Sequence, residues 1–200
     1  MRWPSRLVIA SQNRAKAGQM IKILSKANSR VEILTLSDFG IVQEPEESGL
    51  TYRDNAEIKA KYACETLDEW CLADDAGIEI DYFNGNPGVY SKRFLGAELP
   101  FAEKNFAILK AMEGLERKYR GARFQCAVCL AIPKEVPVHF FARCDGEIAL
   151  EAKGSNGFGY DPIFFVPEFQ TTMADLEDEK KFLISHRGKV LHQLIEFLQA

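Results

Sequence analysis

The stretch from Trp70 to Gly77 constrains the fold of this chain more than any other. The apolar run Trp70-Cys71-Leu72-Ala73 leads directly into two adjacent carboxylates, Asp74 and Asp75, and a glycine follows after one alanine. The apolar run predicts a buried strand. Because two ionised carboxylates are costly to bury alone, we expect cations, hydrogen-bond donors or a ligand site at the end of that strand. A turn is the alternative, since Asp-Asp-Ala-Gly also suits turns.

Length, charge and cysteine content limit the classes of protein to which this chain can belong. A chain of 200 residues with 46% hydrophobic residues suits one α/β domain or two closely joined lobes. The net charge of −4 argues against sequence-independent nucleic-acid binding but allows a local basic pocket for a small anion. The five cysteines are odd in number, and we see no signal peptide and no segment of transmembrane length. We therefore expect a cytoplasmic protein with reduced thiols and with neither a nucleic-acid nor a membrane partner.

The N-terminal segment reads as a strand, a polar turn and a helix. The strand is Leu7 to Ala10, the turn runs from Ser11 to Lys16, and the helix extends to about Ala27 with Asn13 as its N-cap. Backbone amides and the positive end of a helix dipole suit a phosphate, with Lys16 in the first turn. The glycines of a P-loop are missing. An ordinary capped helix with a solvated lysine is the alternative, and on local grounds the stronger one.

A second helix is predicted from Thr51 to Leu67. Asn55 and Lys59 are four residues apart and fall beside its apolar stripe, so both side chains should point inward. An inward lysine calls for an anion, although lysine also snorkels to the surface. The acidic loop from Gln43 to Gly49 is either solvated surface or the source of a carboxylate for a hard cation that also contacts Asp75.

The middle of the chain predicts further strands and one helix. Residues 78–83 alternate like a half-exposed strand that starts after Gly77, and a helix is expected from Phe101 to Met112. Residues 124–130 and 140–150 should pair as a long hairpin. Cys126 and Cys129 form a CxxC, but positions three apart on a strand face opposite sides, so we reject a metal site there.

Two later segments contain side chains that suit the binding of a ligand. The glycine-rich loop 155–162 contains Phe158, whose ring can stack on a base, and Asp161, which can accept from a base N–H. Ser185-His186-Arg187 places donors before the last helix, where positive charge opposes the dipole unless an anion faces it. An ordinary loop and a core histidine are the alternatives.

Taken together, these features predict a nucleoside triphosphate site. The inward or loop-end cations and the carboxylates fit a polyphosphate bound through Mg²⁺, and the aromatic loop fits a nucleobase. The cations are Lys16, Lys59, Lys181 and Arg187, and the carboxylates are Glu46, Asp74 and Asp75.

Seven segments, in this order and spacing, resemble one known family over nearly the whole chain: the non-canonical purine nucleoside triphosphate pyrophosphatases of the inosine triphosphate pyrophosphatase type. The segments are residues 10–16, 46–49, 55–60, 73–77, 87–91, 157–162 and 185–188. The resemblance implies an α/β fold with a long mixed central sheet flanked by helices, and two lobes with a cleft between them. It implies that residues 1–200 form a single pyrophosphatase domain, that the protein is a homodimer, and that it requires Mg²⁺ to hydrolyse dITP, ITP or XTP to the monophosphate and pyrophosphate.

The same resemblance assigns roles to residues. Asp75 looks like the catalytic carboxylate and a metal ligand, and Glu46 looks like the second metal ligand, with Glu47 as the alternative. Ala76 departs from the serine common in bacterial relatives, so only a backbone contact to substrate is assigned to it. The implied substrate-binding residues are Ser11, Gln12, Asn13, Arg14, Ala15 and Lys16 with Lys59 for the phosphates, and Phe158, Gly159, Tyr160, Asp161, Lys181, His186 and Arg187 for base and sugar.

Two other functions remain open at this stage. One is a nucleotide-binding sensor that has lost hydrolysis, although Asp75 and both phosphate-side lysines are present. The other is a pyrophosphatase with the same fold that prefers another modified or a pyrimidine triphosphate.

Overall fold

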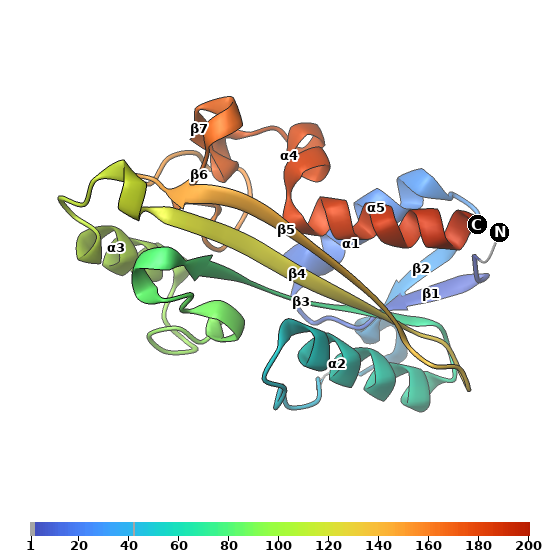
Figure 1. The fold of residues 1–200 in the computed structure, drawn as a ribbon. Helices are drawn as coiled ribbons and strands as arrows, with labels where there is room; N and C mark the ends of the chain where they lie inside the picture. The colour runs from blue at the N-terminus through green and yellow to red at the C-terminus, as the bar shows by residue number, and fades with distance from the viewer. Residues whose placement is uncertain (1–2, 42) are drawn as a thin grey trace. The chain divides into compact units, whose positions relative to one another are not determined.

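A seven-stranded mixed sheet runs through the structure, a computed structural model that describes residues 3–41 and 43–200 (Figure 1). The strand order is β2-β1-β3-β4-β5-β6-β7; β1 pairs in parallel with β2 and β3, and β6 pairs antiparallel with β5 and β7. The strands are β1 (Arg6–Ile9), β2 (Glu32–Thr35), β3 (Cys71–Ile80), β4 (Gly121–Ala131), β5 (Val138–Ile148), β6 (Phe164–Val166) and β7 (Thr171–Thr172). The α-helices are α1 (Arg14–Ala27), α2 (Tyr52–Leu67), α3 (Phe101–Ala111), α4 (Asp178–Ile184) and α5 (His186–Gln199). The predicted α/β class with a mixed sheet flanked by helices is confirmed.

Strand β3 differs from its prediction. The paired carboxylates lie neither at a strand end nor in a turn, because β3 continues without a break through Asp74, Asp75 and Gly77 to Ile80. The separate strand expected from residue 78 is therefore the second half of β3. Pairing with neighbouring strands has overridden the local turn preference of Asp-Asp-Ala-Gly.

Contacts divide the chain into two compact units. Unit 1 comprises residues up to Asp75 together with Cys126–Ala142 and Arg187–Ala200; unit 2 comprises Ala76–Gln125 and Arg143–His186. The prediction of one domain over residues 1–200 stays a prediction.

In unit 1, helices pack on both faces of the parallel strands, as continuous apolar strands require. Figure 1 shows α2 on one side of β1 and the first half of β3, and α5 on the other. Ala17, Met20 and Leu24 of α1 are buried, as are Val190, Leu191, Leu194 and Leu198 of α5.

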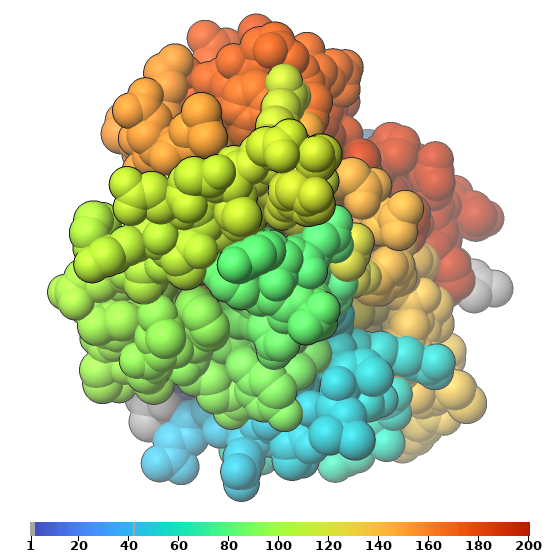
Figure 2. All heavy atoms as spheres, turned by 60° about the vertical axis from the view of Figure 1, so that its left-hand side comes forward, coloured from blue at the N-terminus to red at the C-terminus, as the bar shows by residue number. Residues whose placement is uncertain are grey.

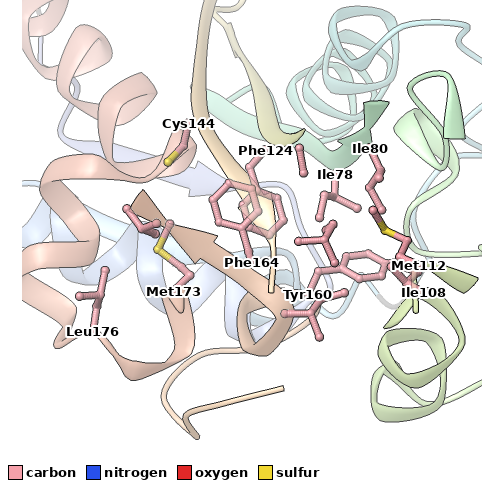
Figure 3. Packing of buried hydrophobic residues seen from close by; sticks show 14 residues of the cluster. Ile78, Ile80, Ile108, Met112, Phe124, Cys144, Tyr160, Phe164, Met173 and Leu176 are labelled. Carbon is pink, nitrogen blue, oxygen red and sulfur yellow. The ribbon is translucent and has the colours of Figure 1, made fainter. Parts of the chain in front are cut away.

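In unit 2, a separate hydrophobic core forms around Phe164 (Figure 3). Phe124 lies against Phe164 with ring centroids 4.4 Å apart, and Ile78 and Ile80 come from the second half of β3. Helix α3 adds Ile108 and Met112 to the same cluster. This core supports the loop that carries Phe158 and Asp161.

Strands β4 and β5 are neighbours joined by only residues 132–137, which confirms the hairpin because a connection this short permits only antiparallel pairing.

The segment before α5 was predicted wrongly. Residues 178–184 form the short helix α4, and α5 begins at His186, so His186 and Arg187 lie in its first turn rather than ahead of it. Within residues 3–41 and 43–200, no helix has both the length and the apolar character needed to cross a membrane.

Candidate active site

Asp74 is the fully buried half of the carboxylate pair in unit 1. Its Oδ2 accepts hydrogen bonds from Arg187 Nε at 3.1 Å and Nη2 at 2.9 Å, and it lies 3.6 Å from Lys16 Nζ. Burial alone would raise the pKa of Asp74, but the charges of Lys16, Arg187 and Lys59 outweigh it and hold the pKa well below its usual range. Asp74 is therefore ionised near neutral pH, and it is held between Lys16 of helix α1 and Arg187 of helix α5.

Asp75 faces the other way, as the next residue on a strand must. Its Oδ2 accepts a hydrogen bond from Asn55 Nδ2 of α2 at 3.1 Å, and Lys59 Nζ lies 3.9 Å from Oδ1. Burial raises the pKa of Asp75, the charges of Lys59 and Lys16 oppose this, and Glu47 adds to the rise; the net pKa is above its ordinary value. Two adjacent carboxylates with pKa values pushed apart suit two different roles, and the one with the raised pKa is the better proton acceptor near neutral pH.

Lys59 joins two carboxylates from separate segments. Its Nζ donates to Glu47 Oε1 at 2.7 Å, and its pKa is raised because Asp75, Asp74 and Glu47 outweigh the effect of its burial. The prediction that Asn55 and Lys59 point inward is confirmed: both are buried, at 0% and 4% exposure. Glu46 is exposed, so the acidic-loop residue in contact with Lys59 is Glu47.

The turn before α1 is engaged in capping. Asn13 accepts from the amides of Ala15 and Lys16, both at 3.1 Å, which confirms it as the N-cap. The amide of Gln12 donates to Glu44 Oε1 at 2.6 Å. Several amides that we expected to meet a phosphate are thus bonded within the chain, and Lys16 is directed towards Asp74. Arg14 and Ala15 are exposed.

In unit 2, the glycine-rich loop is fixed by an ion pair. Lys181 is 4% exposed; its Nζ donates to Asn156 O at 2.6 Å and to Asp161 Oδ2 at 3.3 Å. Gly157 has a φ of +112°, and a Cβ there would overlap Asp161 Oδ2 and Lys181 Nζ, so the ion pair leaves room only for glycine. Phe158 is half-buried beside them.

Other contacts hold the same loop in place. Tyr160 is buried and donates to Ser91 O at 2.7 Å, and Gly159 O accepts from Asn105 Nδ2 at 3.0 Å. The loop therefore presents Phe158 and Asp161 from a firmly anchored backbone.

The hydrogen-bond donors predicted at residues 185–187 do not all belong to one compact unit. His186 belongs to unit 2, where its ring stacks on Phe124 with centroids 4.7 Å apart. Arg187 belongs to unit 1, where it binds Asp74 and donates from Nη1 to Gln19 Oε1 at 3.0 Å. The role predicted for both residues towards base and sugar stays a prediction.

A hard metal ion fits part of this arrangement. No cluster of three or more His, Cys, Asp or Glu suited to a metal occurs among the residues that the structure describes. Asp75 and Glu47, however, both approach Lys59 Nζ, so two carboxylates come to one place. One or two carboxylates completed by phosphate oxygens and water are the usual ligands of Mg²⁺, so these residues suit it.

The cysteines lack the features of catalytic or metal-binding thiols. All five are free and buried, and burial raises the pKa of Cys71, Cys126 and Cys129 to about 12. Such thiols stay protonated near neutral pH and are poor nucleophiles and metal ligands.

Sequence reasoning missed Gln19, the second partner of Arg187. The only available signal was spacing: Gln19 lies three residues after Lys16, on the same face of α1. It also missed Asn105, a polar residue of α3 that bonds a loop 54 positions away in the sequence.

The fold and the charged cluster on β3 define an α/β protein with a polar site built on that strand. The model of the Ham1 family matches residues 7–197, and the chain belongs to that family. A protein of Listeria innocua named dITP/XTP pyrophosphatase is 43% identical over 190 residues, covering 95% of this chain and 93% of its own. A protein of the same name from Vibrio parahaemolyticus is 40% identical over 197 residues, covering 98% of this chain and 97% of its own. The solved structure of a HAM1 protein from Coxiella burnetii superimposes with a TM-score of 0.87 at 38% identity, covering 98% of this chain and 99% of that one. These findings confirm the predicted family.

Proposed function

We propose that this protein hydrolyses the non-canonical purine nucleoside triphosphates dITP, ITP and XTP to the monophosphate and pyrophosphate, and that it requires Mg²⁺. The names of the relatives support the reaction. The observation that carries the proposal is the pairing of Asp75 and Glu47 on buried Lys59, because it joins hard oxygen ligands to a phosphate-binding cation.

Asp75 and Glu47 would hold the metal. Glu47 replaces Glu46 as our first choice because it contacts Lys59, whereas Glu46 is exposed. When bound, Mg²⁺ supplies charge neutralisation at the phosphate oxygens. Lys59 and Lys16 would bind the β- and γ-phosphates and stabilise the negative charge of the departing pyrophosphate.

In the reaction, the oxygen of a water molecule attacks the α-phosphorus, and the bond from that phosphorus to the bridging oxygen breaks. The proton of the water passes to Asp75, the buried carboxylate that contacts Asn55 and Lys59. The electron pair of the broken bond leaves with pyrophosphate. Asp74 takes no proton, because its cations keep it ionised.

Base recognition is proposed for Phe158, Asp161 and the donors of residues 185–187. Phe158 would stack on the purine, and Asp161, held by Lys181, would accept a base N–H. Hypoxanthine and xanthine carry an oxygen at C6 where adenine carries an amine, and donors from residues 185–187 would meet that oxygen. Against adenine they would be left unpaired, a polar mismatch that discriminates by orders of magnitude.

A side-by-side assay tests this function. We expect pyrophosphate release from dITP, ITP and XTP, at least about 100-fold lower kcat/KM for ATP, and loss of turnover with EDTA that added Mg²⁺ restores. Equal turnover of ATP and ITP would contradict the selectivity account. Nucleotide binding without pyrophosphate release would indicate a sensor, and preference for a pyrimidine or another modified triphosphate would indicate a different pyrophosphatase.

The proposal also includes a homodimer and a cytoplasmic location. Exposed aromatic residues support the dimer: Tyr82 and Tyr90 are 48% and 51% exposed, and Figure 2 shows the green segment of unit 2 that contains them at the surface. Sedimentation analysis should give twice the chain mass of 22.6 kDa, and a monomer at micromolar concentration would contradict the dimer. The five free cysteines support a reducing compartment.

A further inference from the structure

We propose that Asn55 is a positioning residue that sets the separation of Asp75 and Glu47 by bonding to β3 with one end of its amide and to the acidic loop with the other. The inference rests on the proposed function, since these two carboxylates are the proposed metal ligands.

The geometry of Asn55 uses both halves of its side chain. Nδ2 donates to Asp75 Oδ2 at 3.1 Å, and Oδ1 accepts from the amide of Gly49 at 2.8 Å. The residue is 0% exposed in the first half of α2. A buried amide with both ends bonded has one orientation, so it transmits the position of the loop to the carboxylate.

Gly49 shows how closely the loop approaches α2. A Cβ at this position would lie 2.6 Å from Asn55 Oδ1 and 2.9 Å from Asn55 N. Only glycine allows the backbone to come near enough for the hydrogen bond to Oδ1. The fit is therefore specific to this pair of residues.

Lys59 completes the arrangement one turn further along α2. It binds Glu47, two residues before Gly49, and lies near Asp75. Asn55 and Lys59 thus each contact both the loop and β3 from the same helix face. The lysine can leave Glu47 for a phosphate, whereas the neutral amide of Asn55 has no charge to redirect. Asn55 would keep both carboxylates in place when Lys59 changes partner.

Other residue types would fail at position 55 for identifiable reasons. Leucine or alanine would leave the Gly49 amide and an oxygen of Asp75 without their partner. Aspartate would keep the bond to Gly49 but would set a second negative charge against Asp75.

The test measures metal binding as well as activity. We would titrate Mn²⁺ into the protein with imidodiphosphate, a stable pyrophosphate mimic, and follow free Mn²⁺ by electron paramagnetic resonance. Asn55→Ala should raise the dissociation constant of Mn²⁺ by about 10–100-fold, the usual cost of removing a group that orients a metal ligand. Gly49→Ala should weaken binding in the same way, and the double variant should be less impaired than the product of the two single effects.

Thr172→Val is the matched control. It removes a buried side chain to backbone hydrogen bond, from Thr172 Oγ1 to Lys153 O at 2.7 Å, in unit 2. It should lower the melting temperature without changing Mn²⁺ binding. Equal weakening by Thr172→Val, or Mn²⁺ binding by folded Asn55→Ala and Gly49→Ala variants within about twofold of the wild type, would overturn the positioning role.

The outcomes separate this inference from the proposed function. If the wild type binds no Mn²⁺ with imidodiphosphate, the metal site fails and the positioning role fails with it. If the wild type binds Mn²⁺ and hydrolyses dITP but the variants bind equally well, only the positioning role fails. If the variants bind Mn²⁺ weakly but the wild type does not hydrolyse dITP, the positioning role stands and the proposed hydrolytic activity is wrong.

Discussion

Asp75→Asn should lower the turnover of dITP by about a hundredfold or more while leaving the fold intact. The carboxylate is the proposed proton acceptor and metal ligand, and asparagine cannot accept the proton of the attacking water. Asparagine keeps an oxygen that can still accept from Asn55 Nδ2, so local packing should survive. Steady-state pyrophosphate release, with circular dichroism as the check on folding, measures the effect.

Asp145→Asn is the control for this experiment. Its side chain is 64% exposed on β5, so the same chemical change there should leave turnover unchanged. Near-normal turnover in a folded Asp75→Asn protein would rule out the assignment of Asp75.

Asp74→Asn should instead act on stability, lowering the free energy of unfolding by about 3–5 kcal/mol. The side chain is inaccessible to solvent and balances Arg187 and Lys16, so removing its charge leaves two cations uncompensated inside unit 1. Urea denaturation at pH 7 measures the loss. Asp38→Asn removes an exposed carboxylate and should be far milder. A variant as stable as the wild type would show that the pair is not needed for folding.

The sign of the pH dependence follows from the depressed pKa of Asp74. A carboxylate whose folded pKa lies below its unfolded value contributes stability that is fully present above the unfolded pKa, about 4. That contribution falls as the pH drops towards the folded pKa. The stability difference between the wild type and Asp74→Asn should therefore be constant above about pH 5 and shrink below pH 4. A difference independent of pH down to pH 2 would contradict the ionised role of Asp74.

Local patterns predicted the elements that have strong periodicity or specific caps. The N-cap at Asn13 and the inward side chains of Asn55 and Lys59 followed from patterns within single helices, and the helix predicted from Thr51 begins at Tyr52 with Thr51 as its N-cap. The continuous β3 could not be foreseen, because Asp74 to Gly77 favours a turn locally and only pairing with sequence-distant strands extends it. Helix α4 has seven residues, too few for a clear periodic pattern.

The hydrogen-bond and ion-pair partners of the charged residues could not be predicted from the sequence. The sequence predicted that acidic and basic residues share one site, but it could not show that Asp74 binds Arg187 while Asp75 contacts Asn55 and Lys59. That division depends on which face of β3 each residue occupies and on which helix covers that face. The choice of Glu47 over Glu46 likewise depends on the path of an irregular loop, for which no periodicity exists.

The products of dITP hydrolysis test the central claim most directly. Phosphorus-31 nuclear magnetic resonance of dITP incubated with the enzyme and Mg²⁺ should show the signals of dIMP and pyrophosphate rising together, with no inorganic phosphate at early times. Signals of dIDP and inorganic phosphate would place the cleavage at the γ-phosphate and contradict the account.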